Sequence, residues 1–571
     1  MARYATYLEI SDDGLTMAHV LSLAGCTVRA PSREEALQRL PGAIRDYLAW
    51  LRRHGEAAPT ETEPIEIAVV EESTGLGPFT PGDTAALFAP DRDPITPEEM
   101  EHHFRLMADS RADLLALVED LPDELLDWRP DPQSYTIRRV LRHIGNAEEW
   151  YVSRLVSPET LPAEWEDDEG LPILEFLEME RRTALDRLRR LSETERSEVF
   201  YPQQWTDHPE ERWTARKALR RFLEHEREHV GQAREILSMH RRHLLAGLAA
   251  ARGELVAQLV SLDERTLAEV PACGDWTVKD TLAHIAAWDR WSLRELGRMV
   301  DGEDPDTSAV RDINGFNAAN VAAWKKKALG EVVAEMHEAR AAWVAWMESL
   351  PEEEFFRRRR RARSDWGLPK WVEVFRGHDE EHASHLAEWR ETQEKRPGGP
   401  KHVLLAALAA RRAELLAASA LVPADRRTSL PVCGHWTLRD VVGHIADWES
   451  WTVEGLGHMA AGRAPQVPYV EDEEAWNQEH ARARRDQPLE AAWADFQAAR
   501  QALLEILEGM DQVALEQAFP GVWDAETTPY AWALVSLAHD AEHARDITEV
   551  LLGAAGPAEN GPAKSYTSRG K

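Results

Sequence analysis

The chain has 571 residues, too many for one compact core, and 43% of them are hydrophobic, which is enough to bury several cores. The formal net charge of −34 disfavours bulk binding to nucleic-acid backbones or anionic membrane surfaces, because both attract basic proteins. No stretch approaches the roughly 18 apolar residues of a membrane span, and no secretory signal pattern opens the sequence. With only three cysteines, a disulfide framework is not expected, so we expect a cytoplasmic, bacterial-type protein with reduced thiols.

The first 90 residues predict a small α+β domain. Residues 3–10, 16–28 and 63–71 have the composition of strands, and residues 32–55 have the periodicity of an amphipathic helix. We expect the strands to form an antiparallel sheet.

One motif in this region carries a resemblance. The turn Ala24–Gly25–Cys26 is followed by Ser32–Arg33–Glu34–Glu35–Ala36–Leu37, and together they resemble the HicB-like, antitoxin-type domain. The resemblance covers about residues 3–75.

From residue 97 onward the sequence repeats itself. PACGDWTVKDTLAHIAAWDRW (271–291) matches PVCGHWTLRDVVGHIADWESW (431–451) without a gap, and residues 134–155 fit the same frame more weakly. A repeat of this length indicates tandem copies of one structural unit. We therefore predict domains over 1–90, 97–240, 241–395 and 402–555, with a disordered tail over 556–571.

The junctions between copies differ. Residues 394–401 (EKRPGGPK) form a Pro/Gly break between the second and third copies. The first two copies meet near residues 239–242 without an evident linker, which suggests a nearly continuous helix.

Each copy predicts a four-helix bundle. In copy one, Thr96 can cap the first helix and Pro97 suits its first turn. Thr277 and Thr437 begin the second helix of their copies, each with an Asp three residues later. A third helix covers about residues 329–350 in copy two, and a fourth carries paired histidines. The predicted fold is mainly α: three tandem four-helix bundles preceded by a small α+β domain.

Three histidines recur at the same places in every copy. One lies in the second helix, and two lie four residues apart in the fourth. The sets are His143 with His225 and His229, His284 with His378 and His382, and His444 with His539 and His543. Residues four apart share one helix face, so both imidazoles can reach one ion, and a facing helix supplies the third. Three protein ligands leave coordination positions open, as in catalytic metal sites, and imidazole suits divalent Zn, Ni, Fe or Cu.

Histidine pairs at this spacing also occur in helices without metal. Here the same three positions recur in three diverged copies, and this recurrence favours metal binding over a shared packing role.

These histidines carry a second resemblance. One His on the second helix and His-x-x-x-His on the last resemble the DinB-like (DinB/YfiT-type) superfamily over about residues 97–555. The resemblance implies a four-helix metal-binding domain with the nine histidines above as ligands. Its described activities include thiol-dependent S-transferases and isomerases that use mycothiol or bacillithiol, and self-resistance hydrolases. Copy one departs from the pattern, with Gln133–Thr136 in place of the Cys-Gly-x-Trp-Thr lead.

Two acidic residues lie between the histidines of each pair, one directly after the first histidine and one directly before the second. They are Glu226 and Glu228, Asp379 and Glu381, and Asp540 and Glu542. At 100° per residue they lie to either side of the histidine face, so they are candidates to orient a ligand or accept a proton rather than to bind metal. The competing interpretation is a solvated charge or a contact to a neighbouring helix. Copy one also matches the H-E-x-x-H protease motif, which we treat as coincidental because the third histidine lies on another helix.

Four further features stay open at the level of sequence. Trp150, Trp291 and Trp451 favour a core role over a pocket role. Cys273 and Cys433 precede the second helix, but copy one has no equivalent, so neither is assigned as a nucleophile. Asn317 and Asn477 recur and either cap a helix or contact a ligand. The arginine run 357–363 favours a loop paired with acids over an anion site.

Two functions remain open. The first is a metal-dependent thiol S-transferase or hydrolase that acts on small electrophilic molecules, with a divalent metal and a low-molecular-weight thiol as cofactors. The second is a non-catalytic, metal-stabilised binding or scaffold array whose N-terminal domain recruits a partner. We expect a small-molecule substrate in the first case, and neither a membrane nor nucleic acid as partner in either case.

Overall fold

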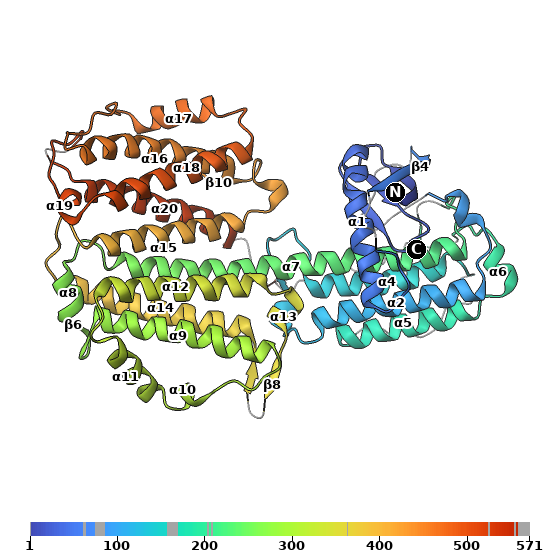
Figure 1. Cartoon of the computed structure of the whole chain (residues 1–571). Helices are drawn as coiled ribbons and strands as arrows, with labels where there is room; N and C mark the ends of the chain where they lie inside the picture. The colour runs from blue at the N-terminus through green and yellow to red at the C-terminus, as the bar shows by residue number, and fades with distance from the viewer. Residues whose placement is uncertain are drawn as a thin grey trace. The chain divides into compact units, whose positions relative to one another are not determined.

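The computed structural model describes residues 2–60, 64–74, 86–156, 170–202, 205–206, 209–361, 364–523, 526–552 and 556–557 (Figure 1). The chain forms two compact units. Residues 1–129 and 133–236 make up most of the first, and residues 237–556 most of the second. The structure is mainly α, with one small α+β region at the N-terminus, which confirms the predicted fold class.

The N-terminal sheet has the order β3-β2-β1-β4. Its strands are β1 (Ala2–Ile10), β2 (Thr16–His19), β3 (Thr27–Ala30) and β4 (Ile65–Ser73). The prediction of an antiparallel sheet is wrong for β4, which pairs parallel to β1. The reason is the helix between β3 and β4, which carries the chain back across the sheet before β4 begins.

Helix α1 (Arg33–Arg53) covers this sheet. Ser32 caps it by accepting a hydrogen bond from the Glu35 backbone N–H, and the apolar face with Leu40 and Ile44 is fully buried. The single strand predicted over residues 16–28 is instead β2 and β3, joined by a turn at Gly25, whose φ of 94° favours glycine.

The first bundle consists of α2 (Pro97–Val118), α4 (Ile137–Ser153), α5 (Ile173–Arg189) and the start of α7 (Ala215–Ala257). Thr96 caps α2 in a capping box with Glu99, as the sequence predicts. The shorter elements of this unit are η1 (Ala89–Arg92), α3 (Asp123–Leu126), β5 (Trp128–Arg129) and α6 (Glu193–Ser197).

Helix α7 belongs to two bundles. It continues without a break through residues 239–242, so the last helix of the first bundle is also the first helix of the second. This confirms the continuous helix expected at that junction.

The second bundle continues with α9 (Val278–Val300), α12 (Leu329–Ser349) and α14 (Leu368–Arg390) (Figure 1). Its shorter elements are α8 (Glu264–Glu269), β6 (Pro271–Cys273), β7 (Trp276–Thr277), α10 (Ser308–Arg311), α11 (Ile313–Trp324), α13 (Glu352–Phe356), β8 (Arg359–Arg361) and β9 (Ser364–Trp366).

The third bundle repeats this plan with α15 (Lys401–Ala420), α16 (Leu438–Ala460), α18 (Leu489–Gly509) and α20 (Pro529–Leu552). Its shorter elements are η4 (Ala424–Arg426), β10 (Pro431–Cys433), β11 (Trp436–Thr437), α17 (Glu473–Ala483) and α19 (Gln512–Leu515). A last short strand, β12 (Gly556–Pro557), follows the third bundle and is not part of it.

The second and third bundles share one hydrophobic core. Leu259 and Leu282 of the second belong to the same buried cluster as Leu404 and Leu503 of the third. The Pro/Gly segment 394–401 therefore connects two bundles that pack against each other within the second unit.

The Cys-Gly-x-Trp-Thr lead is a short β-hairpin, which the prediction of a four-helix bundle in each copy did not include. β6 pairs with β7 and β10 pairs with β11, and the turn glycines Gly274 and Gly434 have φ of 60° and 58°. The hairpin ends at the Thr that caps the second helix, so it fixes where that helix begins.

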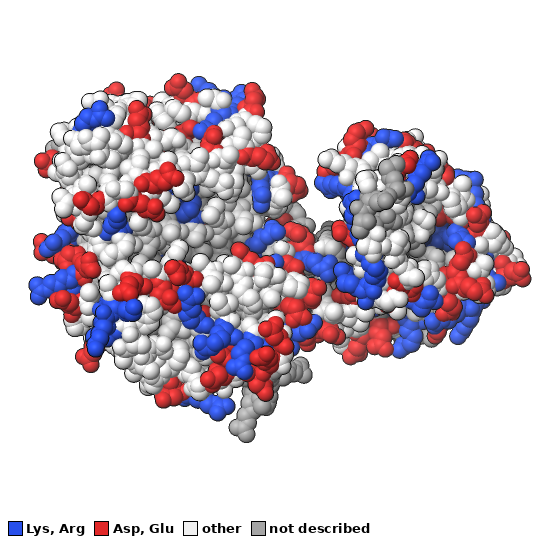
Figure 2. All heavy atoms as spheres, in the orientation of Figure 1, with Lys and Arg blue, Asp and Glu red and all other residues white. Residues whose placement is uncertain are grey.

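The described residues contain no helix long and apolar enough to cross a membrane. On the face shown in Figure 2, lysine and arginine side chains are interspersed with acidic ones over each unit.

Candidate metal centres

In every bundle, the recurring histidines converge. The lone histidine projects from the second helix (α4, α9 or α16), and the pair projects from the fourth (α7, α14 or α20). Nε2 of the lone histidine lies 3.0 Å from Nε2 of the first paired histidine in bundle one, and the same two atoms are 2.9 Å apart in bundles two and three. The two paired Nε2 atoms are 3.1, 3.2 and 3.0 Å apart in the three bundles.

These distances fit a shared metal ion. Nitrogens that each lie about 2.0–2.1 Å from one ion cannot be more than about 4.2 Å apart. The structure brings together each predicted set: His143, His225 and His229; His284, His378 and His382; His444, His539 and His543. Each set could therefore hold one ion.

All three centres are largely enclosed. His225, His284 and His543 are only 3%, 5% and 6% exposed. Burial, together with the neighbouring imidazoles, lowers the pKa of His284 to about 3, of His378 to about 4 and of His444 to about 3. The neutral imidazole that results is the form that binds a metal.

The outer nitrogens of the last histidine differ between the centres. In bundle one, the ring nitrogen Nδ1 of His229 lies 2.7 Å from Gln232 Oε1. In bundle three, Nδ1 of His543 lies 3.5 Å from an Asp546 carboxylate oxygen, which is an ion-pair distance without a hydrogen bond among the described residues. In bundle two, Nδ1 of His382 is buried and has no hydrogen-bond partner among the described residues. Such partners fix the orientation and basicity of a ligand, so the three centres are not equivalent.

The acid after the first paired histidine contacts arginines. In bundle two, Asp379 is fully buried and accepts hydrogen bonds from Arg252 on α7 and Arg340 on α12. The same two arginines bind Asp289 on α9 at 3.0 and 2.9 Å. Two guanidinium groups and two carboxylates therefore link all four helices directly behind the histidines.

The other bundles repeat this buried arginine–carboxylate cluster. Its members in bundle one are Arg111, Arg181, Glu148 and Glu226, and in bundle three Arg412, Arg500, Glu449 and Asp540. Sequence reasoning singled out only the acid beside the histidine and missed the other members. The signal was present, since Arg252, Asp289 and Arg340 recur as Arg412, Glu449 and Arg500 at the repeat offset.

The acid before the second paired histidine lies elsewhere. Glu228 is half-buried, whereas Glu381 and Glu542 are exposed. None of the six flanking acids has a hydrogen bond to a triad imidazole among the described residues.

The aromatic residues closest to the centres come from the hairpin. The Trp276 ring centroid lies 5.2 Å from that of His284, and Trp436 lies 4.7 Å from His444. The recurring Trp291 and Trp451 are 3% and 9% exposed and pack among other aromatic rings, whereas Trp150 is half-buried.

The recurring asparagines contact tryptophans. The indole N–H of Trp288 donates to Asn317 at 2.9 Å, and that of Trp448 donates to Asn477 at 2.8 Å. Asn317 and Asn477 thus anchor α11 and α17 to the second helix of their bundles.

The two hairpin cysteines have different surroundings. The Cys433 thiol donates to Asp546 at 3.2 Å, and burial followed by this carboxylate raises its pKa to about 12. Cys433, His543 and Asp546 form a further group whose ligand atoms lie close together. Cys273 is half-buried at the matching place in bundle two.

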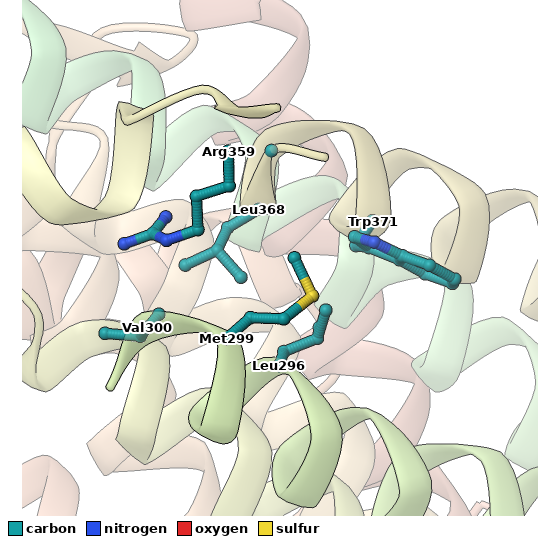
Figure 3. Close-up of a pocket in the computed structure, with 7 residues that line it drawn as sticks. Leu296, Met299, Val300, Arg359, Leu368 and Trp371 are labelled. Atoms are coloured by element: carbon teal, nitrogen blue, oxygen red, sulfur yellow. The ribbon is translucent and has the colours of Figure 1, made fainter. Parts of the chain in front are cut away.

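The arginine run lies at the β8–β9 hairpin rather than in an irregular loop. Arg357 and Arg359 each pair with Glu354, at 2.8 and 2.6 Å, and residues 362–363 lie outside the described residues. Figure 3 shows the void beside this segment, between Leu296, Met299 and Trp371. Its volume is about 10 Å³, so it holds one water molecule at most.

Comparisons with known proteins agree with this geometry. Residues 106–233 and 248–386 each match the model of the DinB superfamily, and residues 405–548 match the model of the mycothiol maleylpyruvate isomerase N-terminal domain. Each matched segment contains one complete histidine triad.

A short stretch of the chain also has a relative among known proteins. Over 59 residues, 10% of the chain, the sequence is 30% identical to the UPF0150 protein Ta0767 of Thermoplasma acidophilum and covers 86% of that protein. That stretch therefore belongs to the UPF0150 family. No solved structure matches the chain.

Proposed function

We propose that each bundle holds one divalent metal ion and serves a thiol S-transferase or hydrolase reaction on small electrophiles. The premise is that the chain carries two domains of the DinB superfamily and one mycothiol maleylpyruvate isomerase N-terminal domain. The carrying observation is the convergence of three imidazoles in every bundle. The thiol we favour is mycothiol, because the family model matched by bundle three is named for a mycothiol-dependent isomerase.

A bound divalent metal would supply Lewis acidity, which lowers the pKa of a coordinated thiol or water to near neutrality. The protein's own groups would do the remaining work. The histidines supply three of the ligands and leave positions open for the thiol or water. The buried arginine–carboxylate cluster holds the second and fourth helices at a fixed separation, which keeps the imidazoles convergent.

The hairpin tryptophans would limit access to the centres. Trp276 and Trp436 lie against the lone histidines of bundles two and three and present an apolar surface there. Such a wall excludes water and packs against the apolar part of an electrophile. Bundle one has Tyr135 at the matching position of its sequence, so we expect a different substrate preference there.

Two measurements test this proposal. Metal analysis of the purified full-length protein should find close to three equivalents per chain, and each of His143→Ala, His284→Ala and His444→Ala should remove close to one. Consumption of mycothiol with chlorodinitrobenzene should then be followed in wild type and in the triple variant. Equal rates in the two proteins would reject the enzymatic proposal, whatever the metal content.

The second candidate is a metal-stabilised array without turnover. Its supporting observation is the enclosure of the triads, because a buried ion can stabilise a fold without reaching a substrate. Under this proposal the N-terminal HicB-like domain would recruit a partner. Metal removal would then lower the melting temperature in a protein that shows no thiol or hydrolase activity with the ion bound.

A further inference from the structure

A ligand-sized cavity lies in the first unit, on the side of α7 away from the metal centre. Its walls come from the turn at Gly25 and Cys26, from Tyr47 and Trp50 on α1, and from Arg227 on α7. We call it the Arg227 pocket. Its volume is about 440 Å³, within the range of roughly 300–1,000 Å³ that is usual for small-molecule sites.

The sequence fixes the walls of this pocket. A Cβ on Gly25 would lie 2.7 Å from Leu223 on α7, so the glycine lets the turn pack directly on that helix. The Tyr47 hydroxyl donates to the carbonyl of Ala24, which ties α1 to the same turn. The Trp50 indole N–H donates to an Asp113 oxygen at 2.7 Å, which ties α1 to α2. The aromatic wall is therefore held in place without a ligand.

Arg227 presents free donors to this pocket. Its guanidinium carbon lies 4.1 Å from the Trp50 ring centroid and 4.7 Å from that of Tyr47. Stacking uses the π face of a guanidinium and leaves its in-plane N–H groups available. Among the residues that the structure describes, none forms a hydrogen bond or an ion pair with this guanidinium. A half-buried cation without a counter-ion is costly, and a carboxylate takes two such donors in parallel.

None of the described acids at the pocket pairs directly with Arg227, although the Asp113 carboxylate attracts it at longer range. Both carboxylate oxygens of Asp113 are engaged, one by Trp50 and the other by His54 at 3.1 Å. Asp46 lies on the exposed side of α1. The remaining acid, Glu228, follows Arg227 in sequence but forms no hydrogen bond or ion pair with it in the part of the chain that the structure describes, and the nearby guanidinium groups of Arg221 and Arg29 attract its charge instead.

We propose that the Arg227 pocket binds a small aromatic carboxylate, with the carboxylate on the in-plane donors of Arg227 and the ring against Trp50. The site belongs to the first unit alone. The position of Arg227 between the paired histidines is Glu380 in the second bundle and Ala541 in the third. This function is separate from the metal centres and does not depend on them.

The test is calorimetric titration of the full-length, metal-loaded protein with benzoate, its neutral isostere benzamide, and inorganic phosphate. We expect benzoate to bind with one site per chain, and benzamide and phosphate to bind at least tenfold more weakly. Arg227→Ala should weaken benzoate binding at least tenfold, and Ala541 shows that the repeat accepts alanine at this position. Ala49→Phe, which fills the pocket from α1 without changing charge, should do the same.

Several results would overturn the proposal. Equal binding of benzoate and benzamide would remove the role of the anion, and equal binding of phosphate would remove that of the ring. Unchanged benzoate binding in Ala49→Phe would place the ligand elsewhere, and this variant decides the matter if Arg227→Ala does not fold. Binding lost in His143→Ala but kept in Arg227→Ala would assign the anion to the metal centre instead.

Discussion

Removal of one arginine from the buried arginine–carboxylate cluster of the second bundle should strongly destabilise the second unit. Arg340 donates to Asp289 at 2.9 Å and to Asp379 at 2.9 Å, and its side chain is 9% exposed while both carboxylates are fully buried. In Arg340→Met, two buried carboxylates would share the single remaining guanidinium of Arg252. Breaking a buried pair in this way costs about 3–5 kcal/mol, because one charge loses its partner without regaining water.

This cost translates into a melting shift. For a unit of roughly 320 residues, the unfolding entropy is about 0.7 kcal/mol/K, so a loss of about 4 kcal/mol lowers the melting temperature by roughly 6 °C. Differential scanning calorimetry of the metal-loaded protein measures it. The double variant Arg340→Met/Asp379→Asn restores charge balance and should recover at least about 1 kcal/mol of the loss.

A matched control lies on the same two helices. Arg290 on α9 pairs with Glu335 on α12 at 2.7 Å, but this arginine is 38% exposed, so Arg290→Met should cost less than about 1 kcal/mol. The reasoning is refuted if Arg290→Met and Arg340→Met cost the same. It is also refuted if Asp379→Asn adds its full separate cost to that of Arg340→Met, because the two sites would then not be coupled.

Three further predictions follow from the same structure. Chelation of the metal should lower the melting temperature, and re-addition of the metal should restore it. A melting temperature that is the same with and without chelator would mean that the triads hold no ion. Gly455→Ala should cost about 1–3 kcal/mol in chemical denaturation, because the new methyl group would meet the Trp532 ring, whereas Gly457→Ala, with open space around it, should be neutral or stabilising by up to about 1 kcal/mol; equal effects would contradict this packing. Burial lowers the pKa of His240 to about 4 in the folded protein, whereas in the unfolded chain this imidazole binds a proton at about pH 6.5. The stability that the neutral His240 contributes above about pH 6.5 is therefore lost as the pH falls toward about 4. His240→Gln should therefore flatten the decline of the free energy of unfolding in that window, and parallel curves for the two proteins would show that His240 does not titrate there.

Much of the fold could be predicted from the sequence. The helical spacing of apolar residues and the capping residues predict the bundle helices, because an amphipathic helix and its Thr cap are local features that need only a few neighbouring residues. The repeat predicts the tandem plan, and the spacing of four places His378 and His382 on one face of α14 before any tertiary contact is known. The lone His284 could be paired with them only because the repeat shows the three recurring together.

Tertiary structure decided the rest, because those features depend on contacts between residues distant in sequence. The parallel pairing of β4 with β1 depends on the path of α1, which no strand pattern records. Asp379 binds arginines from α7 and α12. Helical geometry alone could not decide whether its carboxylate pairs with these arginines, contacts a histidine or faces water. The pocket around Arg227 exists because Gly25 lets the turn between β2 and β3 pack on α7, nearly 200 residues later in the chain. Local sequence sets the direction in which a side chain leaves its helix, but only the packed fold determines what that side chain meets.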